Sequence, residues 1–124
     1  MEFAKPKKIF IVDDDEMLTE ALSDFLTRKV AHHISIYNTG EECMQHISKN
    51  PDVVILDYYM NSVKKDAATG LEVLEAIRKY LPSTRFIMLS SQESYGIAAQ
   101  TIQKGAEYYI IKDEDAFQKI ADLI

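Results

Sequence analysis

Five short apolar runs alternate with stretches of helical periodicity, and this alternation restricts the possible folds of the chain more than any other feature. The first, third and fourth runs are apolar throughout, which is typical of strands covered on both faces in a parallel sheet. The second run alternates and is predicted to be an edge strand. The five predicted strands are Ile9–Val12, Ile34–Tyr37, Val53–Leu56, Phe86–Leu89 and Tyr108–Ile111.

The intervals between these runs have the periodicity of amphipathic helices. Apolar residues at i and i+3/i+4 spacing between Met17 and Leu26 predict the first helix. Capping boxes of the form Thr-x-x-Glu predict that the second and third helices open at Thr39 and Thr69. Pro51 and Pro82 follow the expected ends of these two helices. The five predicted helices span 17–26, about 39–48, 69–80, 95–104 with Gly105 as C-terminal cap, and about 115–124.

Strict alternation of strand and helix indicates an α/β fold with a doubly wound, five-stranded parallel sheet and right-handed crossovers. The 124 residues suit a single domain over 1–124. In such sheets ligands bind at the carboxyl ends of the strands, near the switch in strand order. The polar residues that follow each apolar run are therefore the candidates for a functional site.

Composition excludes several classes of function. The net charge of −6 disfavours broad contact with nucleic acid, so we expect no direct nucleic-acid binding by this domain. Apolar stretches of four or five residues are too short for a signal peptide or a membrane span, which predicts a cytoplasmic protein without membrane contact. The single cysteine, Cys43, cannot form an internal disulfide and is interpreted as a half-buried packing residue.

Carboxylates follow the first and third predicted strands, at Asp13, Asp14, Asp15 and Glu16 and at Asp57. The fold places these two groups side by side. Two carboxylates ~4 Å apart repel by about 4 kcal/mol at an effective dielectric constant of 20, so a cation is needed unless their pKa values rise. Hard oxygen ligands favour Mg²⁺. The alternative for residues 13–16 is capping of the next helix, where negative charge suits the helix dipole.

The ends of the fourth and fifth predicted strands carry a hydroxyl and an ammonium. Ser90 and Ser91 follow the fourth run and Lys112 follows the fifth. Each alone is an ordinary turn or surface residue. Together with the carboxylates they form a set suited to phosphoryl transfer, in which a cation, an ammonium and a hydroxyl stabilise the phosphoryl oxygens.

These residues resemble the receiver domain of two-component response regulators, the CheY-like family, and the resemblance covers nearly the whole chain. It implies a flavodoxin-like (βα)5 fold with strand order 2-1-3-4-5. The segments that carry it are Ile11–Glu16, Val53–Asp57, Met88–Ser91, and Gly105–Ala106 followed by Tyr109 and Lys112.

The resemblance implies a signalling switch in a phosphorelay rather than an enzyme with a separate substrate. Asp57 would accept a phosphoryl group from a sensor histidine kinase or phosphotransfer protein, and Ser90 and Lys112 would contact that group. Mg²⁺ would be held by Asp13, Asp14, Asp57 and the backbone carbonyl of Tyr59. Tyr109 matches the aromatic switch position that moves with Ser90, although simple strand packing explains it equally well and is the preferred interpretation of Tyr108.

Output and kinetics follow from the same resemblance. The fourth helix, fifth strand and fifth helix would form the switching face, which would act on a downstream output domain or protein partner. The resemblance also implies that this face can pair two copies of the domain in a homodimer. Tyr59 and Gln92 stand two places after Asp57 and Ser90, where side chains tune the access of hydrolytic water.

The chain departs from the family pattern at two places. Asp113 replaces the usual proline after Lys112, as in NarL/FixJ-type receivers, whose domain is often the N-terminal part of a longer regulator. The segment 58–69 is longer than usual, with Asn61 in place of a common proline, and Lys64 and Lys65 in it affect partner recognition or are simply solvated.

Three other functions share parts of this pattern. A haloacid-dehalogenase-type phosphatase needs a second aspartate where Tyr59 stands, and a flavodoxin needs a phosphate loop where Asp13–Asp15 would repel phosphate. A phosphorylation-independent pseudo-receiver that acts as a protein-binding module remains the alternative.

Overall fold

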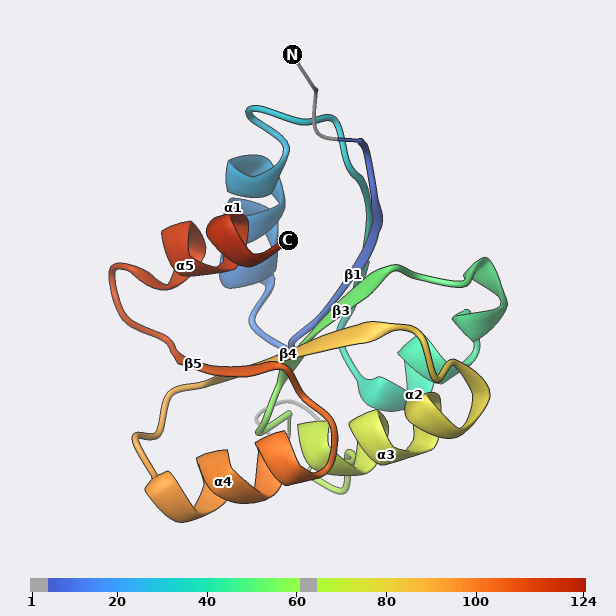
Figure 1. The fold of residues 1–124 in the computed structure, drawn as a ribbon, viewed down its shortest axis with the longest axis vertical. Coiled ribbons are helices and arrows are strands. Elements are labelled where there is room, and N and C mark those ends of the chain that lie inside the picture. Colours follow the sequence, from blue (N-terminus) through green and yellow to red (C-terminus); the bar gives the residue numbers. More distant parts are fainter. Residues whose placement is uncertain (1–4, 61–64) are drawn as a thin grey trace.

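The computed structural model describes residues 5–60 and 65–124, which form one five-stranded parallel sheet with helices on both faces (Figure 1). The strand order is β2-β1-β3-β4-β5, which confirms the predicted α/β class and topology. The elements are β1 (Lys8–Val12), α1 (Glu16–Leu26), β2 (His33–Tyr37), α2 (Gly40–Met44), the 3-10 helix η1 (Ile47–Lys49), β3 (Val53–Asp57), α3 (Gly70–Tyr80), β4 (Arg85–Ser90), α4 (Tyr95–Gln103), β5 (Tyr108–Ile111) and α5 (Ala116–Leu123).

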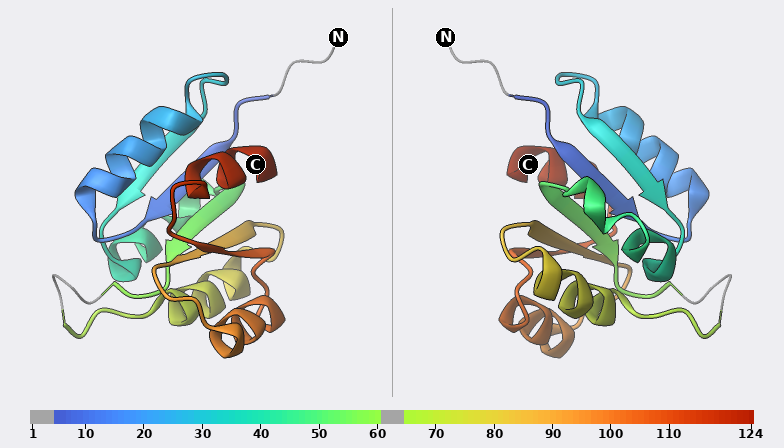
Figure 2. Two further views of the ribbon diagram at one scale, coloured as in Figure 1. Left: turned by 90° about the vertical axis from the view of Figure 1, so that its left-hand side faces the viewer. Right: turned by 90° about the vertical axis from the view of Figure 1, so that its right-hand side faces the viewer.

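The sheet separates two apolar cores, one on each face. Helices α1 and α5 cover one face, and α2, α3 and α4 cover the other (Figures 1 and 2). Along β3, alternate residues enter the two cores: Val53 and Ile55 pack with α1 and α5, and Val54 and Leu56 pack with α3. Each such side chain contributes about 1.5–3 kcal/mol when it leaves water, so β3 is held from both faces of the sheet.

The edge strands are more exposed, as predicted for β2. Ile36 is 36% exposed in β2, whereas all five residues of β3 are buried. Tyr108, interpreted as a strand-packing residue, lies in β5 at the other edge of the sheet and is 43% exposed. Met17, predicted to lie on the apolar face of α1, is 84% exposed beside the site described below.

The second helix is shorter than predicted. Thr39 caps α2 by accepting a hydrogen bond from the Glu42 N–H at 3.1 Å, as expected. However, α2 ends at Met44, and η1 continues the segment to Lys49. His46 stacks on the Tyr37 ring with 5.1 Å between ring centroids, a tertiary contact that local periodicity does not reveal.

Cys43 on α2 is fully buried rather than half-buried, and burial of its thiol raises its pKa to about 12.

Among the described residues, no helix has both the length and the apolar character needed to cross a bilayer.

Candidate functional site: an acidic pocket at the carboxyl ends of the strands

The carboxylates predicted to converge do so at the carboxyl edge of the sheet. Asp57 is the last residue of β3, and Asp13 and Asp14 directly follow β1, the strand paired with β3. Carboxylate oxygens of the three residues lie within 4.8 Å of one another. Asp13 and Asp57 are almost fully buried, at 1% and 4% exposure.

The four acidic residues after β1 divide between the two roles considered for them. Asp15 caps α1, because its side chain accepts a hydrogen bond from the Leu18 N–H at 3.2 Å. Asp13 accepts a hydrogen bond from the Asp15 N–H at 3.0 Å, and its own N–H donates to the Tyr37 carbonyl. Asp13 is thereby fixed within the pocket, and capping explains only the outer part of the run.

Lys112 reaches into the pocket from the end of β5. Its ammonium lies 3.0 Å from Asp13 Oδ2 and 3.1 Å from Asp57 Oδ1. Its backbone N–H donates to the Ser90 carbonyl at 2.8 Å, which holds it against the end of β4. Lys112 was predicted to contact a phosphoryl group on Asp57. Its direct contacts with the carboxylates of Asp57 and Asp13 were not predicted, because the sequence does not show which carboxylate an ammonium will reach.

The electrostatics of the pocket favour an additional cation. Burial and the charge of Asp13 raise the pKa of Asp57 to about 7, against the lowering effect of Lys112. Burial alone would lower the pKa of Lys112, but the carboxylates of Asp13 and Asp57 outweigh it and raise that pKa. Three carboxylates facing one ammonium leave an excess of negative charge in a largely buried site.

The donor set fits Mg²⁺. Its three carboxylates offer hard oxygen ligands, and within the described residues the buried Asp13 Oδ2 is met by the Lys112 ammonium at 3.0 Å and by no other donor. One divalent ion would offset the charge that Lys112 leaves unbalanced. The pocket therefore has the composition of a magnesium site.

Ser90 and Tyr109 are linked through the same backbone segment. Ser90 is fully buried at the end of β4, and its Oγ accepts a hydrogen bond from the Gln92 N–H at 3.1 Å. The Tyr109 hydroxyl donates to the Gln92 carbonyl at 2.8 Å. The predicted switch residues thus share Gln92, whose backbone bonds both of them.

Gly70, in the segment after Asp57, lies too close to β3 to carry a side chain, a requirement that no sequence motif indicates. The Gly70 N–H donates to the Tyr58 carbonyl at 2.8 Å, and a Cβ at Gly70 would lie 2.4 Å from the Asp57 carbonyl oxygen. Only the close approach of α3 to β3 reveals this requirement. Tyr59 is 37% exposed and packs edge-on against Tyr58.

Three more residues of the segment 58–69 were singled out from the sequence: Asn61, Lys64 and Lys65. Lys65 is exposed, as its interpretation as a solvated residue requires. The predictions for Asn61 and Lys64 lie outside the described residues.

Comparison with known proteins agrees with this geometry. Residues 9–123 match the family model of the response regulator receiver domain. The chain is 36% identical over 110 residues to the probable C4-dicarboxylate response regulator DctR of Bacillus subtilis, covering 87% of this chain and 46% of that protein. It is 28% identical over 111 residues to the transcriptional regulatory protein LnrK of the same organism, covering 88% and 48%.

The chain spans about half the length of these curated relatives. A solved structure of similar fold is the BeF3-activated receiver domain of DrrB, a Thermotoga maritima protein, with a TM-score of 0.81, 23% identity, and coverage of 95% of this chain and 94% of that one. The acidic pocket, the strand order and the family match together show that this chain belongs to the family of response regulator receiver domains, the CheY-like signalling domains of two-component systems.

Proposed function

We propose that this receiver domain is a phosphorylation switch whose phosphoacceptor is Asp57. The observation that carries the proposal is the convergence of Asp57 with Asp13, Asp14 and Lys112 in one buried pocket. An isolated aspartate at the end of a strand would be an ordinary turn residue. A buried aspartate beside two carboxylates and an ammonium has the surroundings that phosphoryl transfer requires.

The reaction would transfer a phosphoryl group from the phosphohistidine of a sensor kinase or phosphotransfer protein to Asp57. An ionised Asp57 oxygen forms the new P–O bond while the P–N bond to the histidine breaks, and the imidazole nitrogen takes up a proton. Mg²⁺ held by Asp13, Asp14, Asp57 and the Tyr59 carbonyl would supply charge neutralisation for the phosphoryl oxygens. Lys112 needs only a small shift from Asp57 Oδ1 to pair with the same oxygens.

The output would be a change in the segment that joins β4 to α4. Phosphorylation adds close to two negative charges and three acceptor oxygens. The Ser90 hydroxyl would turn to donate to the phosphoryl group, which disturbs its bond from the Gln92 N–H and, through Gln92, the bond from Tyr109. The face of α4, β5 and α5 would then change its affinity for an output domain, a protein partner or a second copy. We place this exchange in the cytoplasm, where the kinase domain of a sensor would meet it.

Acetyl phosphate with Mg²⁺ tests the proposal directly. The wild-type chain is expected to gain one acid-labile phosphoryl group by intact mass, and Asp57→Ala is expected to gain none. Asp66→Ala is the matched control, because Asp66 is exposed and outside the pocket. A wild-type chain that stays unmodified, while still binding Mg²⁺, would identify a phosphorylation-independent pseudo-receiver instead.

A further inference from the structure

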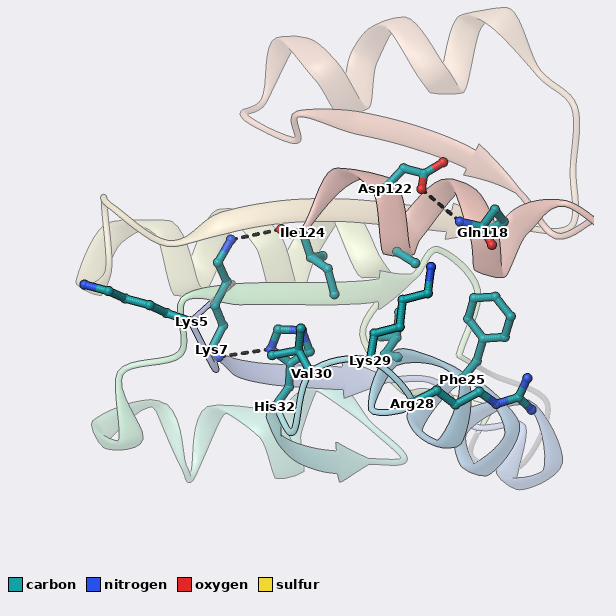
Figure 3. A pocket seen from close by; sticks show the side chains of 12 residues that line it. Lys5, Lys7, Phe25, Arg28, Lys29, Val30, His32, Gln118, Asp122 and Ile124 are labelled. Carbon is teal, nitrogen blue, oxygen red and sulfur yellow. Dashed lines mark hydrogen bonds between the residues drawn. The ribbon is translucent and has the colours of Figure 1, made fainter. Parts of the chain in front are cut away.

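A second cavity lies at the opposite edge of the sheet from Asp57. It has a volume of about 490 Å³ and is bounded by the C-terminal ends of α1 and α5 and by the segments that lead into β1 and β2 (Figure 3). Because the five-residue strand β3 is about 16 Å long, this cavity is separate from the acidic pocket. Its volume is in the usual range for small-molecule sites.

The walls of the cavity combine apolar side chains with cationic ones. Phe25 and Leu26 come from α1, Val30 from the turn after it, and Ala121 and Ile124 from α5 and its end. Phe25 and Phe117 pack with 5.8 Å between their ring centroids, which fixes this wall. A ligand with an aromatic or branched apolar part would remove these surfaces from water.

The cavity also contains a cation without an anionic partner. Figure 3 shows the Lys29 amine extending across the cavity toward α5. Within the described part of the chain, no carboxylate lies within 4.0 Å of it. Asp122, the carboxylate among the lining residues, instead accepts a hydrogen bond from Gln118 at 2.8 Å.

Lys29 is not needed to bond the carbonyl groups at the ends of α1 and α5, because other side chains bond them. The last carbonyls of the α5 segment accept from Arg85 and Lys7, at 2.6 Å to Leu123 and 3.0 Å to Ile124. At the end of α1, the Thr27 hydroxyl donates to the Ser23 carbonyl. Lys29 is therefore available for an external anion, although its position after α1 also offsets part of the helix dipole.

We propose that this cavity binds a small organic anion with an apolar body, such as an aromatic or medium-chain carboxylate or sulfonate. Its anionic group would pair with Lys29, and its apolar part would lie against Phe25, Val30 and Ala121. The neutral form of His32 offers a further donor: its Nδ1 accepts from the Lys7 N–H at 3.0 Å, so Nε2 carries the proton.

Titration with 8-anilinonaphthalene-1-sulfonate tests this site, with fluorescence and amide chemical shifts as readouts. The expected result is saturable one-site binding, with shifts at Phe25, Val30 and Ala121. Lys29→Glu is expected to weaken binding about three- to tenfold, the range of a partly exposed charged contact. Lys79→Glu, a charge reversal at an exposed lysine outside this cavity, is the matched control and is expected to leave affinity unchanged.

Two further arms separate the charge from the cavity. N-phenyl-1-naphthylamine, the same ring system without the sulfonate, should bind Lys29→Glu and wild type equally. Ala121→Phe should fill the cavity and abolish the binding of both probes, with thermal unfolding as the check that it folds.

Three results would overturn the proposal. They are equal sulfonate affinity in Lys29→Glu and Lys79→Glu, unchanged binding in a folded Ala121→Phe, and displacement of the sulfonate by an acidic peptide but not by 4-phenylbutyrate. The last result would assign the cavity to peptide docking.

Discussion

At the residue scale, Tyr59 stands where its side chain would affect the reaction proposed for Asp57. Tyr59 is partly exposed and stands two residues beyond Asp57, packed edge-on against Tyr58 with 4.6 Å between ring centroids. A bulky ring in this position would restrict the approach of water to a phosphorylated Asp57.

We therefore expect Tyr59→Asn to shorten the lifetime of the phosphorylated form. The smaller, polar side chain admits and orients water, and an acceleration of about tenfold corresponds to about 1.4 kcal/mol of barrier. The measurement is the loss of the phosphoryl group with time by intact mass. Tyr80→Asn, at an exposed tyrosine at the end of α3, is the control. Equal decay rates in wild type and Tyr59→Asn would remove the shielding role.

His32 gives a residue-scale prediction for the dependence of stability on pH. Burial, then the charges of Lys7 and His33, lower the pKa of His32 from its usual value of 6.5. The unfolded chain therefore binds this proton more readily than the folded chain, so the contribution of His32 to stability is complete above pH 6.5 and is lost as pH falls below it.

His32→Asn should flatten this part of the stability curve, because an amide oxygen can accept from the Lys7 N–H without titrating. Urea unfolding at pH 7.5 and pH 5.5 provides the measurement. A pH-dependent loss of the same size in wild type and His32→Asn would contradict the assignment.

At the scale of elements, the start of α3 is fixed by the approach of its backbone to β3. Thr69 and Glu72 form the complete capping box that the sequence predicts, with hydrogen bonds of 3.2 and 3.1 Å. Gly70 lies directly inside this cap, and its Cα faces the Asp57 carbonyl.

Gly70→Ala is expected to destabilise the domain by about 1–3 kcal/mol, the usual cost of overpacking. The added methyl group would meet the backbone of Asp57 and the Met88 sulfur, neither of which can withdraw easily. Gly96→Ala in α4 is the matched control: it has open space and should stabilise the helix by about 0.5–1 kcal/mol. Chemical unfolding measures both. The prediction fails if the two substitutions have effects of the same sign.

The same elements show what the sequence does and does not determine. Apolar runs predicted every strand of the sheet, because central strands must be apolar on both faces and edge strands on at least one. The end of α2 and the exposure of Met17 and Tyr108 were missed, because they depend on which faces remain uncovered after packing. In the pocket, residue types predicted the convergence of Asp13, Asp14, Asp57 and Lys112. They did not predict the ion pair between Lys112 and Asp13, or that the Gln92 backbone bonds both Ser90 and Tyr109.

At the scale of the whole molecule, the acidic pocket is expected to make stability depend on divalent cations. Asp57 is buried beside Asp13, so a charged carboxylate is held there at a cost in free energy. Asp57→Asn removes one of these charges and should raise the melting temperature in the absence of metal.

Mg²⁺ at ten times its dissociation constant should add about 1.4 kcal/mol to the stability of the wild type, or roughly 5 °C. Asp57→Asn should respond much less, because it has lost one ligand. Differential scanning calorimetry with and without Mg²⁺ measures both changes. Identical shifts in the two proteins would show that the ion binds elsewhere.

The central position of β3 also has a consequence for how the chain fluctuates. Both neighbours of β3 are themselves hydrogen-bonded strands, and all five of its residues are buried. Amide hydrogen exchange there should therefore require opening of most of the domain, whereas exchange at the margins of the sheet needs only local fraying. A phosphoryl group on Asp57 would be attached to the slowest-exchanging strand, so brief local openings elsewhere in the domain would not expose it to water.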